Sequence, residues 1–226
     1  MRVYSGSFIP ANQSADLHAP LLLTIPGIDN SGPGHWQSIW ERELDDCRRV
    51  DLGSWDRPQR NLWVTRLNAT ISAVSRPVVL VAHSLGCHVV GWWNALEQPL
   101  ASKVVGALLV APPEVEDAPI DERLRPFGSI ARQRLSFPSL LVASQNDPYA
   151  SFGRSKRMAR IWGSRLIDAG PMGHINAESG VRDWPYGLFL LRRLIAAVTP
   201  ERTPLVPGGA AAFFARPAGF LPENAV

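Results

Sequence analysis

Three residues of this chain have side chains that together suit nucleophilic acyl transfer. Ser84 lies in the stretch VVLVAHSLGCHVV, between an apolar run and a segment with helical spacing. A serine hydroxyl is a weak nucleophile until a base removes its proton, and histidine, with a pKa of about 6.5, is the usual base. A buried carboxylate holds the imidazole in the required tautomer. Ser84 therefore needs a histidine and a carboxylate brought to it by the fold, and His174 and Asp147 are the candidates.

The turn around Ser84 departs by one residue from the G-x-S-x-G pattern, because Ala82 stands at the position of the first glycine. A strand that reverses sharply into a helix crowds the positions two before and two after the serine, so both must be small. Ala82 and Gly86 meet this requirement. A serine after an apolar strand is also a common helix N-cap, so the turn alone does not establish a nucleophile.

His174 is the expected general base. It lies in the loop AGPMGHIN, after the last expected strand, where Gly170 and Gly173 give the backbone freedom to project the side chain. The alternative is an ordinary solvent-exposed loop histidine. The other four histidines fit less well: His18 precedes the first strand, His35 begins a helix, His83 adjoins Ser84 and should point away from it, and His88 lies one helical turn further on.

Asp147 is the expected carboxylate partner of the histidine. The segment LLVASQNDPYAS places it just beyond an apolar strand, where Pro148 fixes a turn. Asn-Asp-Pro is also a strong turn signal in any protein, and Asp168, at the end of the following strand, is the competing carboxylate. The chain order Ser84, Asp147, His174 is that of α/β-hydrolases and differs from the orders in chymotrypsin and subtilisin.

The oxyanion of a tetrahedral intermediate needs two fixed N–H donors. One is expected from the amide of Leu85, at a helix N-terminus whose dipole also favours negative charge. The second is expected from Ile28 in the loop TIPGIDNSGPGHW, although a plain glycine-rich connection explains that loop equally well. Trp36 and His35 follow the loop directly and are the candidate substrate-pocket residues, with packing as the alternative role of the tryptophan.

The elements that must position these residues alternate between apolar runs and segments with helical spacing. The expected strands are Leu21–Ile25, Arg48–Leu52, Val78–Ala82, Val104–Ala111, Ser139–Ala143 and Arg165–Ile167, and the expected helices are His35–Leu44, Asn61–Val74, Ser84–Leu96, Phe152–Trp162 and Tyr186–Val198. Apolar strands that lack period-two alternation indicate an α/β fold, with a mostly parallel sheet covered by helices on both faces. Reacting groups of such sheets collect beyond the carboxyl ends of the strands. The charged segment Glu114–Phe137 is too short for a large cap domain.

Composition limits the domain organisation and the partners. The 226 residues and 46% hydrophobic content suit one globular domain, expected over residues 1–198, followed by a tail over 199–226 that is rich in Pro, Gly and Ala. The net charge of +3 comes from scattered basic residues, which argues against nucleic acid as a partner. No apolar run is long enough for a signal peptide or a membrane span, so we expect a cytoplasmic protein without membrane association. The oligomeric state stays open.

No cofactor is expected, because the chain has no Walker A loop, no G-x-G-x-x-G after its first strand and no H-E-x-x-H. No metal site is expected either. The two cysteines, Cys47 and Cys87, are too few for a disulfide framework.

Five segments in order resemble the small serine hydrolases of the retinoblastoma-binding-protein-9 and YdeN family: PGIDNSGPGHWQSIWE, SWDRPQRNLW, VVLVAHSLGC, SQNDPYASF and MGHINAESG. The resemblance runs from about Leu21 to Leu194. It implies a compact, lidless α/β-hydrolase with a triad of Ser84, Asp147 and His174, acting as an esterase on small or short-acyl esters. The alternatives are an amidase or aminopeptidase-like hydrolase of small amides, and a weakly catalytic protein-interaction module on the same fold.

Overall fold

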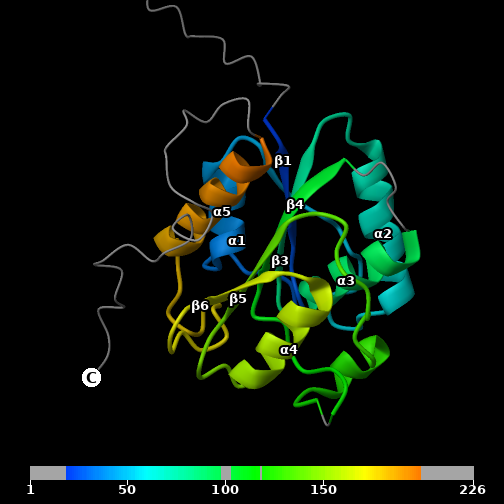
Figure 1. Ribbon diagram of the computed structural model, residues 1–226, viewed down its shortest axis with the longest axis vertical. Coiled ribbons are helices and arrows are strands. Elements are labelled where there is room, and N and C mark those ends of the chain that lie inside the picture. The colour runs from blue at the N-terminus through cyan, green and yellow to red at the C-terminus, as the bar shows by residue number, and fades with distance from the viewer. Residues whose placement is uncertain (1–18, 98–102, 118, 200–226) are drawn as a thin grey trace, which may run out of the picture.

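A six-stranded sheet forms the centre of the computed structural model, which describes residues 19–97, 103–117 and 119–199 (Figure 1). Its strands are β1 (Leu21–Ile25), β2 (Cys47–Arg49), β3 (Val78–His83), β4 (Val104–Val110), β5 (Ser139–Ala143) and β6 (Arg165–Asp168). They lie in the order β2-β1-β3-β4-β5-β6, and every neighbouring pair is parallel. All six carboxyl ends therefore lie along the same edge of the sheet.

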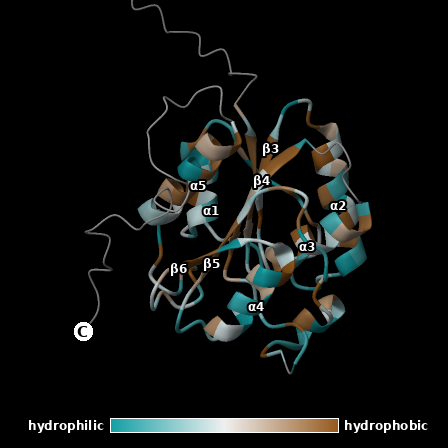
Figure 2. Cartoon of the chain, viewed as in Figure 1, coloured by the Kyte–Doolittle hydropathy of each residue, from teal (hydrophilic) through white to brown (hydrophobic). Residues whose placement is uncertain are grey.

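Helices cover both faces of this sheet. The helices α1 (Trp36–Glu43) and α5 (Pro185–Val198) pack on one face, and α2 (Arg60–Ala73), α3 (Leu85–Glu97) and α4 (Phe152–Trp162) on the other (Figure 1). Alternate strand residues enter the two cores: Leu80 packs with α2 to α4, and its neighbour Val79 with α1 and α5. Because both faces are buried, the inner strands β1, β3, β4 and β5 are largely apolar, and much of the sheet is brown in Figure 2. The edge strands β2 and β6 carry charged residues and are partly exposed.

The expected α/β-hydrolase architecture is confirmed, and most expected boundaries agree within one or two residues. A strand does form near the expected Arg48–Leu52, but its expected end was wrong, since β2 ends at Arg49. Val50 and Leu52 are fully buried, so their apolar side chains enter the core without extending the strand. The next helix was expected to begin at Ser84, but β3 ends at His83 and α3 begins at Leu85, which leaves Ser84 in neither element.

The segment between β4 and β5 carries one short 3₁₀ helix in its described part, η1 (Glu122–Phe127), and no cap domain. The expected tail lies outside the described residues apart from Thr199. In the described parts of the chain, no helix combines the length and the apolar character needed to cross a membrane.

Candidate active site

Ser84 occupies a sharp turn at the carboxyl end of β3. Its φ is +53°, a left-handed conformation that few residues other than glycine adopt, and its N–H donates to the carbonyl of Val110 at 2.9 Å. A Cβ on Gly86 would lie 2.1 Å from the carbonyl oxygen of Ile25, so only glycine fits two residues after the serine. Ala82, two residues before it, is fully buried. The turn therefore requires glycine at position 86 and accommodates the small side chain of Ala82.

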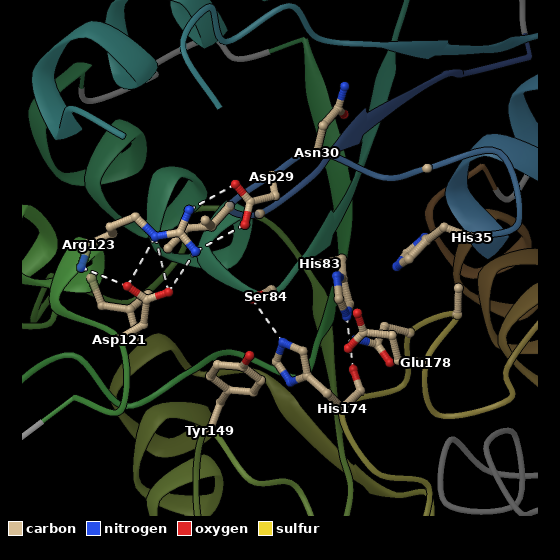
Figure 3. A pocket seen from close by; sticks show the side chains of 16 residues that line it. Asp29, Asn30, His35, His83, Ser84, Asp121, Arg123, Tyr149, His174 and Glu178 are labelled. Atoms are coloured by element: carbon tan, nitrogen blue, oxygen red, sulfur yellow. Dashed lines mark hydrogen bonds and ion pairs between the residues drawn. The ribbon is translucent and has the colours of Figure 1, made fainter. Parts of the chain in front are cut away.

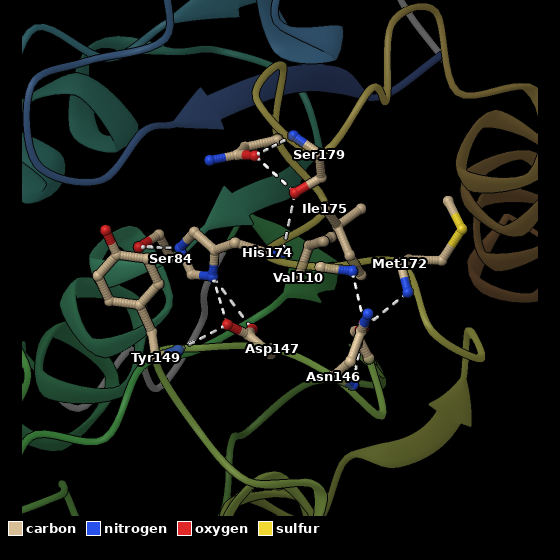
Figure 4. Close-up of polar contacts among 12 residues, drawn as sticks. Ser84, Val110, Asn146, Asp147, Tyr149, Met172, His174, Ile175 and Ser179 are labelled. Atoms are coloured by element: carbon tan, nitrogen blue, oxygen red, sulfur yellow. Dashed lines mark hydrogen bonds and ion pairs between the residues drawn. The ribbon is translucent and has the colours of Figure 1, made fainter. Parts of the chain in front are cut away.

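The structure brings Ser84, His174 and Asp147 into one hydrogen-bonded series (Figure 4). Nε2 of His174 lies 2.9 Å from Oγ of Ser84, and Nδ1 lies 2.9 and 3.0 Å from the two carboxylate oxygens of Asp147. The Asp147 side chain is 2% exposed. Since Nδ1 faces a carboxylate, it carries the proton and donates, which leaves Nε2 free to accept from the serine hydroxyl. This is the tautomer that removal of a serine proton requires.

The turn after β5 fixes the carboxylate. Asp147 also accepts a hydrogen bond from the N–H of Tyr149 at 2.9 Å, and the Tyr149 ring lies 4.3 Å from the His174 ring, centre to centre. The competing carboxylate, Asp168, accepts from the side-chain amide of Gln145 at 2.8 Å instead. Asp147 is therefore the carboxylate that contacts the histidine.

Two backbone amides, those of Leu85 and Ile28, are the expected oxyanion donors. Neither the N–H of Leu85 nor that of Ile28 donates a hydrogen bond within the described part of the chain. A Cβ on Gly27 would lie 3.0 Å from Oγ of Ser84 and 3.1 Å from the nitrogen of Leu85. Gly27 thus leaves unfilled the space beside the Leu85 amide and the serine hydroxyl. The Pro-Gly turn was predictable from the residues, but this contact of the glycine was not.

A cavity of about 350 Å³ opens above Ser84 (Figure 3). Among the described residues, four charged side chains line it, from the loop after β1, from η1 and its N-cap, and from the segment after His174: Asp29, Arg123, Asp121 and Glu178. Arg123 donates to both carboxylate oxygens of Asp29, at 2.8 and 3.0 Å, and to Asp121 at 2.8 Å. Among the described residues, the charged groups of the pocket wall are therefore three carboxylates and one guanidinium.

About half of the cavity surface is apolar, but few long aliphatic side chains contribute to it. Ile28 and Leu124 are the only branched aliphatic side chains among the described residues that line it. No group of three or more His, Cys, Asp or Glu side chains suited to a metal ion occurs in the residues that the structure describes.

Known proteins share the sequence features and the fold described above. A family model described as serine hydrolase matches residues 22–193. The chain belongs to the serine hydrolase family. A protein described as a YdeN-like hydrolase from Pectobacterium atrosepticum is 35% identical, with a TM-score of 0.67 over 81% of this chain and 92% of that one. The resemblance found in the sequence is thus confirmed.

More distant structures share the fold of this serine hydrolase. The ydeN gene product from B. subtilis is 20% identical, with a TM-score of 0.65 over 78% of this chain and 99% of that one. A protein described as the non-heme bromoperoxidase BpoC from Mycobacterium tuberculosis is 13% identical, with a TM-score of 0.59 over 79% and 92%. A search of curated proteins found no match.

Of the two expected pocket residues, His35 lines the cavity and Trp36 lies in the core. His35 lines the cavity, and as the N-cap of α1 it accepts from the N–H of Gln37 through Nδ1 at 3.1 Å. Burial lowers the pKa of His35 to about 4, so the ring is neutral. Trp36 is 0% exposed, does not line the cavity, and packs against the rings of Trp40 and Trp184. The expectation that Trp36 forms a pocket wall was wrong, because α1 turns it into the core.

Two further histidines are buried and reach other partners. Nε2 of His83 lies 2.9 Å from the carbonyl oxygen of His174, and Nε2 of His88 lies 2.8 Å from that of Pro113, so both nitrogens donate. Burial lowers the pKa of His83 well below its ordinary value and that of His88 to about 4. Within the described residues, neither ring forms a hydrogen bond with Ser84, whose Oγ bonds to His174. Sequence reasoning correctly turned His83 away from the serine but missed its contact with the base loop.

Proposed function

We propose that this serine hydrolase is a carboxylesterase that cleaves small or short-acyl esters through an acyl-enzyme intermediate on Ser84. The observation that carries the proposal is the continuous series of hydrogen bonds from Oγ of Ser84 through His174 to the buried carboxylate of Asp147. Such a series activates a serine at neutral pH and then returns the proton to a leaving group.

In the first half of the proposed reaction, Oγ of Ser84 attacks the ester carbonyl carbon while Nε2 of His174 takes the hydroxyl proton. The amides of Leu85 and Ile28 donate to the oxyanion that forms. Asp147 stabilises the imidazolium. As the tetrahedral intermediate collapses, the bond to the alcohol oxygen breaks and Nε2–H protonates the departing alkoxide.

In the second half, water enters the space left by the alcohol. Nε2 of His174 removes one proton from it, and the resulting hydroxide attacks the acyl carbon. Collapse of this second tetrahedral intermediate breaks the bond to Oγ of Ser84, which regains its proton from the imidazolium. The products are one carboxylic acid and one alcohol, and the enzyme returns to its starting state.

The size and lining of the cavity support a small substrate. Its volume of about 350 Å³ is near the lower end of the range of about 300–1,000 Å³ for small-molecule sites. Each methylene group of an acyl chain gains about 0.8 kcal/mol only where apolar surface covers it. Ile28 and Leu124 are the only branched aliphatic side chains among the described lining residues, so a cavity of this size can cover only a short acyl chain.

Labelling with a fluorophosphonate tests the nucleophile. The wild-type protein should be labelled on the peptide that contains Ser84, and Ser84→Ala, shown to be folded by circular dichroism, should not be labelled. A folded wild-type protein that resists labelling would contradict the proposal and favour a binding role for the fold.

Turnover of a matched pair tests the bond type. We expect hydrolysis of 4-nitrophenyl acetate at a rate that far exceeds that of 4-nitroacetanilide, which has the same acyl group on an amide. Efficient cleavage of the anilide beside negligible cleavage of the ester would replace the esterase with an amidase.

A further inference from the structure

The proposed general base lies on a loop without regular secondary structure, Met172–Ile175, which we call the base loop. Side chains therefore take over the hydrogen bonding that a helix or strand would supply. Three backbone N–H groups of the loop donate to side chains: Met172 to Oγ of Ser144 at 2.9 Å, Gly173 to Oδ1 of Asn146 at 2.7 Å, and His174 to Oγ of Ser179 at 3.0 Å (Figure 4).

Two side-chain donors hold the carbonyl groups of the same loop. Nε2–H of His83 donates to the carbonyl oxygen of His174, and Nε1–H of Trp36 donates to that of Ile175, both at 2.9 Å. The donors come from β3 and α1, far from the base loop in sequence, and are 5% and 0% exposed. Hydrogen bonds so well shielded from water fix the backbone more firmly than exposed ones.

The base loop needs such restraint because its backbone is strained. Ile175 has a φ of +51°, in the left-handed region, where a β-branched residue is a rare outlier. Strained conformations of this kind persist only where the surrounding structure holds them. Loss of a restraint on the His174 or Ile175 carbonyl lets the peptide rotate, and the imidazole moves with it. A shift of about 1 Å in a catalytic group can slow a reaction about a hundredfold.

We propose that His83 and Trp36 are positioning residues, whose N–H groups hold the carbonyls of His174 and Ile175 so that Nε2 of His174 stays within reach of Ser84. The inference rests on the proposed function, because it assigns His174 the role of base. The lowered pKa of His83 agrees with it, since a neutral ring with its proton on Nε2 provides the required donor. Neither residue is assigned contact with the reacting atoms.

The chain contains a matched control for Trp36. Trp40 lies on the same helix, is 1% exposed, packs in the same core cluster, and donates its Nε1–H to a backbone carbonyl, that of Asp183, at 2.8 Å. Trp36→Phe and Trp40→Phe therefore remove the same atoms and the same kind of hydrogen bond, and only Trp36→Phe releases the base loop. We expect Trp36→Phe to lower kcat about tenfold or more with KM within about twofold, and Trp40→Phe to keep kcat within about twofold.

His83 provides a test by conservative rescue. Methionine fills a similar volume without an N–H, whereas the side-chain amide of glutamine can donate from nearly the same place. His83→Met should lower kcat about ten- to a hundredfold, and His83→Gln should recover most of that loss. Urea unfolding of each variant separates these effects from a loss of folded protein.

A proton NMR signal provides a readout that does not depend on turnover. The Nδ1–H of His174, held by Asp147, should give a resonance far downfield in the wild-type protein, which disappears in His174→Ala. We expect this resonance to shift or broaden in Trp36→Phe and His83→Met and to stay unchanged in Trp40→Phe.

The outcomes separate the inference from the proposed function. If fluorophosphonate labels Ser84 in the wild-type protein, but Trp36→Phe matches Trp40→Phe in kcat and in the His174 resonance, the positioning role is overturned and the esterase proposal stands. If the wild-type protein is not labelled, the proposed function is overturned, and the base-positioning role falls with it.

Discussion

A single added methyl group at Gly27 should abolish most of the activity. The Cβ of Gly27→Ala would lie 2.8 Å from Cβ of Ser84, 3.0 Å from its Oγ and 3.1 Å from the nitrogen of Leu85. Carbon atoms in contact prefer about 3.5–4.0 Å, so the methyl group occupies the space that a substrate carbonyl oxygen would need. Loss of one oxyanion donor costs about 10²–10³-fold in rate, and we expect kcat/KM to fall by at least that factor.

The same loop contains the control for this substitution. A Cβ on Gly34 would have no heavy atom within 4 Å, and neither Gly34 nor Gly27 has a positive φ that alanine would strain. Gly34→Ala should therefore keep kcat/KM within about twofold and leave stability unchanged or slightly raised. Initial rates with 4-nitrophenyl acetate, together with urea unfolding, measure both quantities. A folded Gly27→Ala protein with a kcat/KM within about threefold of the wild-type value would refute the assignment of this space to the oxyanion.

Three further predictions follow from the triad, a buried histidine and the charges of the pocket. Asp147→Asn should lower kcat with 4-nitrophenyl acetate about 10³–10⁴-fold while fold and KM change little, because the imidazole loses its tautomer and the stabilisation of its charge; a loss under tenfold contradicts the role. His88 has a pKa of about 4 in the fold and 6.5 when unfolded, so the unfolded chain binds more protons between those values, and stability that is complete above 6.5 is lost as the pH falls to 4. When the pH falls from about 7.5 to 5, the free energy of unfolding measured with urea should therefore decrease by about 2 kcal/mol less in His88→Gln than in the wild type. Equal decreases in the two proteins would contradict the burial argument. The described residues of the pocket wall carry three carboxylates and one guanidinium, which should favour a cationic substrate. Glu178→Gln should therefore lower the rate of acetylthiocholine hydrolysis about three- to tenfold relative to that of 3,3-dimethylbutyl thioacetate, the uncharged isostere of this substrate. Glu43→Gln, outside the pocket, should leave the ratio of the two rates unchanged.

The fold and the triad were predictable because their signals are local in the sequence. A fully apolar strand marks a sheet buried on both faces, and residues that follow such strands must meet at one edge. Ser84, Asp147 and His174 were found in this way, and the structure brings them together. The small-residue requirement was equally local, because the crowding around Ser84 arises from the turn itself.

Contacts between distant elements were beyond the same reasoning. Trp36 follows the loop after β1, which made a pocket wall plausible, but the rotation of α1 about its axis decides which side chains face the core. The partner of His83 is the backbone carbonyl of His174. Because every residue has a backbone carbonyl, the residue types do not predict this contact. The contact of Gly27 with Ser84 likewise depends on how closely the loop after β1 approaches α3.

The order of the strands explains why the base loop needs so many restraints. Ser84 follows β3 and His174 follows β6, with β4 and β5 between them in the sheet. At a spacing of about 4.8 Å between neighbouring strands, the chain after β6 must cross roughly 14 Å of the sheet edge to reach the serine. Along that path, side chains that follow β5 hold its amide groups, and His83 at the end of β3 holds the carbonyl of His174. The base loop therefore keeps its histidine in place through contacts with residues that follow β5 and with His83, the residue before the nucleophile, at the end of β3.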